Sequence, residues 1–130
     1  MTFLVDTHLL LWMAAQPERL SDQARVILND EELDTRFSVA SLWEVAIKAS
    51  LGRPQFVIDA RALRRGLLES GFSELPIDVA HVVAVADLPP IHRDPFDRLL
   101  LAQARTEGLT LLTVDAALPP YGDYVLDVAG

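Results

Sequence analysis

Two aspartates flank the start of a predicted helix in the stretch 92–102. Here His-Arg-Asp-Pro-Phe-Asp-Arg runs into the apolar segment Leu-Leu-Leu-Ala. Proline is favoured at the first helical position and aspartate at the N-cap, so we expect Asp94 to cap this helix and Asp97 to lie in its first turn. Both carboxylates could simply serve the free backbone N–H groups and the positive end of the helix dipole. Taken alone, the stretch favours that structural interpretation.

Three further acids occupy similar joints between predicted strands and helices. Asp6 follows the apolar run 3–5, and Asp115 follows the run 109–114. Short apolar runs of this kind are typical of strands that are buried on both faces of a parallel sheet. Glu44 belongs to a Ser-x-x-Glu pattern, which predicts a capping box at the start of a helix. The recurrence of acids at these joints, rather than any single acid, indicates a shared site.

Each of these acids also has an ordinary structural alternative. Asp6 could cap the helix after the first strand, and Asp115 could start a turn. Glu44 could complete the capping box with Ser41 or pair with Lys48 four residues later. At the level of single residues these alternatives stay open.

Strand and helix signals alternate along the chain. This alternation predicts an α/β fold, a three-layer α/β/α domain with a central parallel sheet of four to five short strands. Strands are expected at 3–5, 35–39, 75–77, 109–114 and 124–128, the third of them at a sheet edge because it contains proline. Helices are expected at 9–15, 21–29, 41–52, 59–70, 78–86 and 95–106.

In open α/β sheets, ligands bind beyond the carboxyl ends of the strands, and four or five acids would meet there. The set comprises Asp6, Glu44, Asp94, Asp97 and Asp115. Carboxylates so close together must either take up protons or bind a cation. Carboxylate oxygens suit Mg²⁺ or Mn²⁺, which can lower the pKa of a bound water and direct it at a phosphodiester. The pattern therefore predicts nuclease chemistry.

The net charge of the chain limits which kinds of nucleic-acid surface it can bind. Nineteen acids against eleven bases give a net charge of −8, which argues against a broad basic surface for duplex DNA. Ten of the bases are arginines, the side chain suited to bidentate phosphate contacts. Arg93 and Arg98 flank the two aspartates of the opening stretch and are candidates for binding substrate phosphate.

Several other classes of function are disfavoured. The chain has no cysteine, and its three histidines lack metal-ligand spacing, so thiolate chemistry and a zinc site are not expected. No window approaches the ~18 to 20 apolar residues of a membrane span, and the N-terminus lacks a signal-peptide pattern, so we expect a cytoplasmic protein with no membrane contact. Serine-hydrolase, P-loop, dinucleotide and H-E-x-x-H motifs are absent.

The remaining conspicuous side chains have structural interpretations. Trp12 and Trp43 are predicted to belong to the core, and His92 to be a loop residue rather than a general base. Ser38, Ser41 and Thr113 are expected as helix caps or as hydrogen-bonding partners of the acids.

Four segments together resemble a PIN domain, and specifically the VapC toxins of bacterial toxin-antitoxin pairs. They are Leu-Val-Asp-Thr-His at 4–8, Ser-Val-Ala-Ser-Leu-Trp-Glu-Val-Ala-Ile-Lys at 38–48, His-Arg-Asp-Pro-Phe-Asp-Arg-Leu-Leu at 92–100 and Leu-Thr-Val-Asp at 112–115. Their order and spacing cover nearly the whole length. The resemblance implies that residues 1–130 form a single PIN-like domain.

The resemblance also implies roles for the acids. Asp6, Glu44 and Asp97 become the core metal ligands, Asp115 the fourth acid and Asp94 an accessory. Family members are Mg²⁺- or Mn²⁺-dependent endoribonucleases, often acting on structured RNA such as tRNA. They are commonly dimeric and are inhibited by a small VapB-like antitoxin that blocks the acidic cleft. An RNA substrate, a cognate antitoxin and a homodimer are therefore expected.

Two other classes of function gather acids at a sheet edge. A receiver-like phosphoacceptor domain binds Mg²⁺ there but places a lysine after a late strand, whereas the single lysine of this chain, Lys48, lies in an early predicted helix. A non-catalytic scaffold that binds metal or protein is the other alternative. Metal-dependent cleavage of RNA is expected of the nuclease and of neither alternative.

Overall fold

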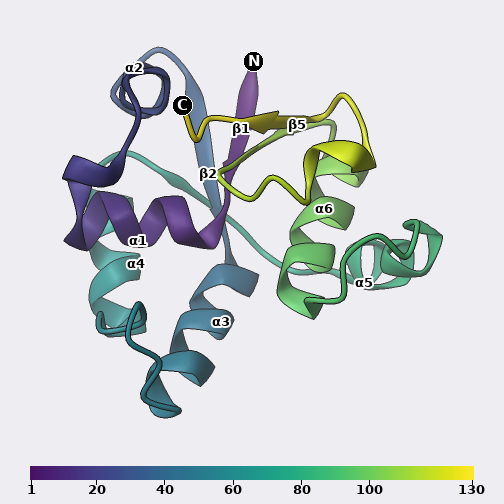
Figure 1. Cartoon of the computed structure of the whole chain (residues 1–130), viewed down its shortest axis with the longest axis horizontal. Coiled ribbons are helices and arrows are strands. Elements are labelled where there is room, and N and C mark those ends of the chain that lie inside the picture. The colour runs from purple at the N-terminus through teal and green to yellow at the C-terminus, as the bar shows by residue number, and fades with distance from the viewer.

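Five parallel strands form one central sheet in the computed structural model, which describes residues 1–130 (Figure 1). In spatial order they are β3 (Ser73–Leu75), β2 (Asp34–Ser38), β1 (Thr2–Val5), β4 (Thr110–Thr113) and β5 (Val125–Asp127). Phe3 of the central strand pairs with Thr35 on one side and Thr110 on the other. Because all strands are parallel, their carboxyl ends meet at one edge of the sheet.

Helices cover both faces of this sheet, which confirms the predicted three-layer fold (Figure 1). The helices are α1 (Thr7–Ala15), α2 (Asp22–Leu28), α3 (Val39–Ser50), α4 (Ala60–Glu69), α5 (Val79–Ala84) and α6 (Pro95–Glu107), with short 3₁₀ helices at Pro17–Arg19, Val85–Asp87 and Pro119–Tyr121. Side chains of α1 to α4 enclose one apolar core and those of α6 the other. Phe3 and Val5 point into the first core and Leu4 into the second, which explains why this strand is apolar throughout.

The helix after β2 begins earlier than predicted, so the capping box at Ser41 is wrong. The Ser38 hydroxyl caps the helix by accepting the backbone N–H of Ala40 at 2.9 Å. Ser41 is already inside the helix, where its hydroxyl accepts a hydrogen bond from Thr7. Glu44 therefore lies in the second turn of α3 and is released from any role as a capping-box partner.

Two other expectations are corrected. The edge strand covers Ser73–Leu75 instead of 75–77, and it ends before Pro76, which has no N–H to continue the ladder. Trp43 is 52% exposed and does not belong to the core; its ring contacts Phe96 edge-to-face at 4.8 Å between centroids. Trp12 is half-buried at the margin of the first core.

The start of α6 agrees with the prediction. Asp94 is the N-cap, and its Oδ1 accepts the backbone N–H groups of Phe96 and Asp97 at 2.8 and 3.1 Å. Gly108 ends the helix with φ = 70°, a left-handed conformation that glycine adopts without the strain a side chain would add. None of the helices combines the length and the apolar character needed to cross a bilayer.

A chain of buried polar groups connects β2 to α6 and α5. The Ser38 hydroxyl donates to Oε1 of Gln103, and Nε2 of Gln103 donates to the carbonyl oxygen of Pro76 and lies 3.4 Å from Nδ1 of His81. The other ring nitrogen of His81 lies 3.0 Å from a carboxylate oxygen of Glu107. Ser38, Gln103 and His81 are almost completely shielded from solvent.

Leu100→Ala tests how much the apolar core beneath α6 contributes to the stability of the fold. Leu100 is fully buried, so the truncation should lower the free energy of unfolding by about 2 to 5 kcal/mol through lost burial and the cavity left behind. Urea denaturation measures the change. Leu51→Ala, at a position that is 65% exposed, is the matched control and should change stability by less than about 0.5 kcal/mol. Equal effects of the two truncations would contradict the assigned core.

Candidate metal centre

Asp6 lies at the carboxyl end of β1 and is only 3% exposed. Its Oδ1 accepts the backbone N–H of Leu9 at 3.1 Å and so caps α1, while its Oδ2 accepts the hydroxyl of Thr113 at the end of β4. Burial raises the pKa of Asp6 above its usual range, although the hydrogen bonds from Thr113 and Leu9 oppose the shift. The acid is therefore both a helix cap and a buried group at the sheet edge.

Glu44 reaches the same edge from α3 and is 1% exposed. One carboxylate oxygen, Oε2, accepts a hydrogen bond from Nζ of Lys48 at 2.6 Å. The other, Oε1, is buried and has no hydrogen-bond partner within the protein. A buried acceptor without a partner is destabilising by roughly 1 to 3 kcal/mol, more when charged, so this oxygen is suited to a ligand such as a cation.

Lys48 links the acids of α3 to those of α6. Its Nζ lies 2.6 Å from Glu44 and 3.6 Å from Oδ2 of Asp94. Partial burial lowers the pKa of Lys48, but the hydrogen bond and charge of Glu44 and the charges of Asp94 and Asp97 outweigh it, and the net shift is upward. Lys48 is thus a fixed positive charge at the wall of the site. From the sequence, Lys48 was considered as a partner of Glu44 and as a lysine out of place for a receiver-like domain, but not as a partner of Asp94.

Asp97 carries the strongest electrostatic signature of the site. The pKa of its carboxyl is raised to about 6. Burial is the largest cause, the charges of Asp94, Asp6 and Glu44 also raise the pKa, and a hydrogen bond from His92 partly opposes the shift. The four carboxylates therefore act on one another although they come from β1, α3 and α6. This is the convergence that the sequence predicted.

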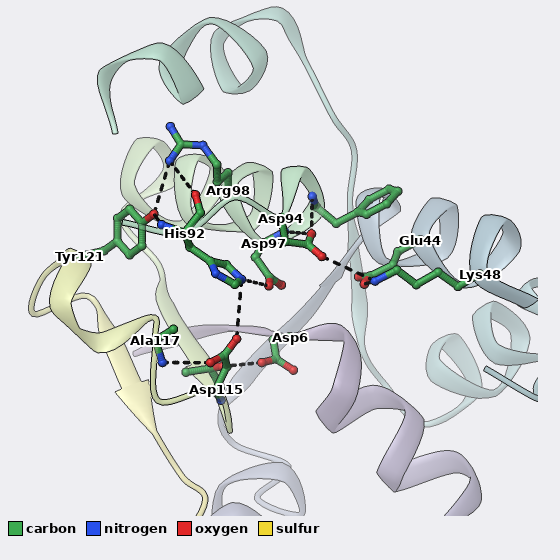
Figure 2. A network of polar contacts seen from close by, with 12 residues as sticks. Asp6, Glu44, Lys48, His92, Asp94, Asp97, Arg98, Asp115, Ala117 and Tyr121 are labelled. Carbon is green, nitrogen blue, oxygen red and sulfur yellow. Dashed lines mark hydrogen bonds and ion pairs between the residues drawn. The ribbon is translucent and has the colours of Figure 1, made fainter. Parts of the chain in front are cut away.

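His92 is a site residue that sequence reasoning set aside. It does lie in the loop before α6, as predicted, but its Nε2 is 2.8 Å from Oδ2 of Asp97 and 3.8 Å from Oδ2 of Asp115 (Figure 2). Asp115 uses its other oxygen to accept the backbone N–H of Ala117 at 2.9 Å, the turn that was the structural alternative. One ligand atom from each of His92, Asp97 and Asp115 lies within 4.8 Å of the others.

The two arginines beside the acids differ in their surroundings. The guanidinium of Arg98 donates to backbone carbonyls on both sides of the loop and lies 3.4 Å from the hydroxyl of Tyr121. The carbonyls belong to Val85, Leu88, Pro89 and His92. Arg98 therefore holds the loop that carries His92, and its donors are largely engaged. Arg93 is exposed. The predicted role of both arginines in phosphate binding stays a prediction.

The donor set fits a hard divalent cation. Figure 2 shows Asp6, Glu44, Asp94, Asp97 and Asp115 turned toward a common space, with Lys48 and His92 at its sides. Carboxylate oxygens are the ligands that such cations prefer. The partnerless oxygen of Glu44 and the raised pKa values of Asp6 and Asp97 are what an acidic cluster displays when its counter-charge is incomplete.

Comparison with known proteins agrees with this fold. The PIN domain family model matches residues 3–122, and the chain belongs to the PIN domain family. Ribonuclease VapC22 of Mycobacterium tuberculosis is 32% identical over 118 residues, which cover 90% of this chain and 89% of that protein. The predicted resemblance to VapC proteins is therefore confirmed.

Solved structures support the fold independently of sequence. VapBC2 from Rickettsia felis, bound to a DNA fragment from its promoter, matches with a TM-score of 0.70 and 12% identity over 97% of this chain and 96% of that chain. VapBC-1 from nontypeable Haemophilus influenzae matches with a TM-score of 0.63 and 14% identity over the full length of both chains. At these identities the likeness concerns the fold alone.

The pH dependence of stability, compared between the wild type and Asp97→Asn, tests the repulsion among the carboxylates of the site. Because the native pKa is about 6 and the usual value is 3.8, the folded protein binds this proton more tightly than the unfolded chain. The free energy of unfolding in EDTA should therefore fall, relative to Asp97→Asn, as the pH rises from about 4 to about 6.5. At pH 7 the Asn variant should be more stable by roughly 1 to 3 kcal/mol.

Urea denaturation at several pH values measures the difference. Asp123→Asn, which removes an exposed aspartate, is the control and should follow the wild type at every pH. A constant difference between wild type and Asp97→Asn over this range would show that Asp97 has an ordinary pKa.

Proposed function

We propose that this chain is a Mg²⁺-dependent endoribonuclease toxin of the VapC type, with Mn²⁺ as a substitute ion. The observation that carries the proposal is the buried, partnerless Oε1 of Glu44 beside carboxylates whose pKa values are raised. A site of this kind gains most from a cation with oxygen ligands. Membership of the PIN domain family and the similarity to a ribonuclease support the same activity.

The acids divide into ligands and supports. Asp6, Glu44 and Asp97 hold the ion, and Asp115 is the fourth acid. When bound, a divalent ion lowers the pKa of a water molecule and neutralises charge on the phosphodiester under attack. Lys48 and His92 each hold one oxygen of a carboxylate, on Glu44 and Asp97, and so fix the direction of the other oxygen. Asp94 shapes the site as the cap of α6 and as the partner of Lys48.

The substrate is RNA, with structured RNA such as tRNA as the first class to test. Arg93, exposed at the rim, and Arg98 are the candidates for contact with substrate phosphate. The chain works in the cytoplasm as a homodimer and is inhibited by a cognate VapB-like antitoxin. Support for this partner comes from the solved structures of similar fold, which include VapBC toxin-antitoxin complexes.

RNA cleavage with and without Mg²⁺ tests the activity. Asp6→Asn and Asp97→Asn should reduce the cleavage rate by more than about 100-fold, because each removes a charged ligand. Asp94→Asn should reduce it by about tenfold or less, because asparagine is also a competent N-cap. Exposed Glu18→Gln is the control and should cleave like the wild type. Equal cleavage by all variants, or cleavage in EDTA, would rule out the proposed mechanism.

Isothermal calorimetry tests metal binding without RNA. Mg²⁺ or Mn²⁺ should bind the antitoxin-free protein, and Glu44→Gln should weaken binding at least about tenfold, because the partnerless oxygen is no longer part of a charged group. Glu69→Gln changes an exposed acid at the end of α4 and should leave binding unchanged. The absence of any heat of binding would favour the non-catalytic scaffold instead.

A further inference from the structure

A groove of about 450 Å³ lies along α1, and none of the site acids is among its lining residues. One wall consists of side chains of α1 and the residues just after it, and the other of the segment 54–57. The α1 residues follow the i, i+3, i+4, i+7 spacing of one helix face. They are His8, Leu11, Trp12 and Ala15.

The inner end of this groove adjoins the metal centre. His8 is two residues beyond Asp6, in the first turn of α1. The His8 ring meets the ring of Phe56 edge-to-face at 6.0 Å between centroids, and Nζ of Lys48 lies 5.2 Å from the same Phe56 ring. These contacts connect His8, which lines the groove, through Phe56 to the lysine that donates to Glu44.

The outer end of the groove carries a positioned guanidinium. The central carbon of Arg19 lies 4.3 Å from the centroid of the Trp12 ring, and its Nη1 donates to Oε1 of Gln16 at 3.3 Å. Arg19 forms no ion pair with a carboxylate, and it is exposed. In a chain with a net charge of −8, an arginine held on an aromatic ring and without an acidic partner is suited to an anionic ligand.

These surfaces match the chemistry of a nucleotide. Bases of single-stranded RNA stack on aromatic rings and on guanidinium planes, and their phosphates pair with arginine. The side-chain amides of Gln16 and Gln55 add donors and acceptors for a base edge. From His8 to Ala15 the helix rises about 10 Å, enough to line one or two nucleotides.

We propose that this groove binds a single-stranded nucleotide next to the phosphodiester that is cut, and so contributes to the choice of cleavage site. The base lies against His8 and Trp12, and Arg19 holds the phosphate. The inference rests on the proposed ribonuclease function, because it assigns part of the RNA substrate to this surface. A protein segment is the competing occupant, and the arginine without an acidic partner, together with the aromatic rings of His8 and Trp12, favours the nucleotide.

Tryptophan fluorescence tests the proposal without any cleavage. The chain has two tryptophans, and Trp43→Phe changes an exposed one, which leaves Trp12 as the reporter. In EDTA, a single-stranded hexaribonucleotide of mixed sequence should quench Trp12, whereas a hexamer of abasic ribose phosphates should not. Arg19→Ala in this background should raise the Kd about tenfold. Arg65→Ala, an exposed arginine of α4, is the matched control and should change the Kd less than twofold.

A second measurement avoids the Trp43→Phe change. Anisotropy of a dye-labelled hexamer with the otherwise unchanged protein should give the same ranking of Arg19→Ala and Arg65→Ala. The proposal is wrong if RNA leaves Trp12 unquenched, if the abasic hexamer quenches equally, or if the two arginine variants bind alike. It is also wrong if a purified antitoxin quenches Trp12 and RNA does not, which would make the groove a protein-docking surface.

The outcome is separable from the proposed activity. Metal-dependent RNA cleavage without any response of Trp12 would overturn the groove assignment and leave the nuclease intact. Quenching by RNA in a protein that never cleaves RNA with Mg²⁺ or Mn²⁺ would support the groove and overturn the nuclease.

Discussion

Mutual repulsion among buried carboxylates is the constraint on which the rest of this structure depends. Asp6 and Glu44 are almost fully removed from solvent. Burial and the neighbouring negative charges raise the pKa of Asp97 to about 6. Such a cluster persists only where the surrounding structure supplies donors and positive charge. The N-terminus of α1 supplies the Leu9 amide to Asp6, and α3 supplies Lys48 to Glu44. The parallel sheet matters because it delivers these donors and acids to a single edge.

The site lies between two layers, and each layer contributes part of it. Glu44 comes from α3 on one side, while Asp94 and Asp97 come from α6, whose core packs on the other face of the sheet. The Lys48–Asp94 ion pair joins the two helices across the site. Small movements of α6 relative to α3 would therefore change the distance between Glu44 and Asp97. The N-cap hydrogen bonds of the two helices do not by themselves prevent such movements.

The sequence predicted the fold well because its signals are local. Apolar runs that end in an acid mark buried strands, and Asp94 with Pro95 marks the start of α6. The acids were found for the same reason, since parallel strands end at one edge. The true start of α3 was missed because Ser38 and Ser41 are equally good caps, and only the end of β2 decides between them. His92 was missed because no motif joins it to its partners, Asp97 five positions later and Asp115 23 positions later, and only the path of the loop turns its ring toward them. Trp43 was assigned to the core on residue type alone, which says nothing of the side of the helix it occupies.

The buried hydrogen-bond network from Ser38 through Gln103 to His81 fixes the position of α6 along its own axis. Nδ1 of His81 accepts the backbone N–H of Asp78 at 3.1 Å, so the neutral ring carries its proton on Nε2, toward Glu107. Gln103 can satisfy its amide only where the Ser38 hydroxyl and the Pro76 carbonyl meet it. If α6 shifted along its axis by one turn, about 5.4 Å, all of these buried groups would lose their hydrogen-bond partners. An apolar core tolerates sliding far better than such a network does. The longitudinal position of Asp97, six residues before Gln103 on the same helix, is therefore set by polar groups on the side of α6 remote from the chemistry.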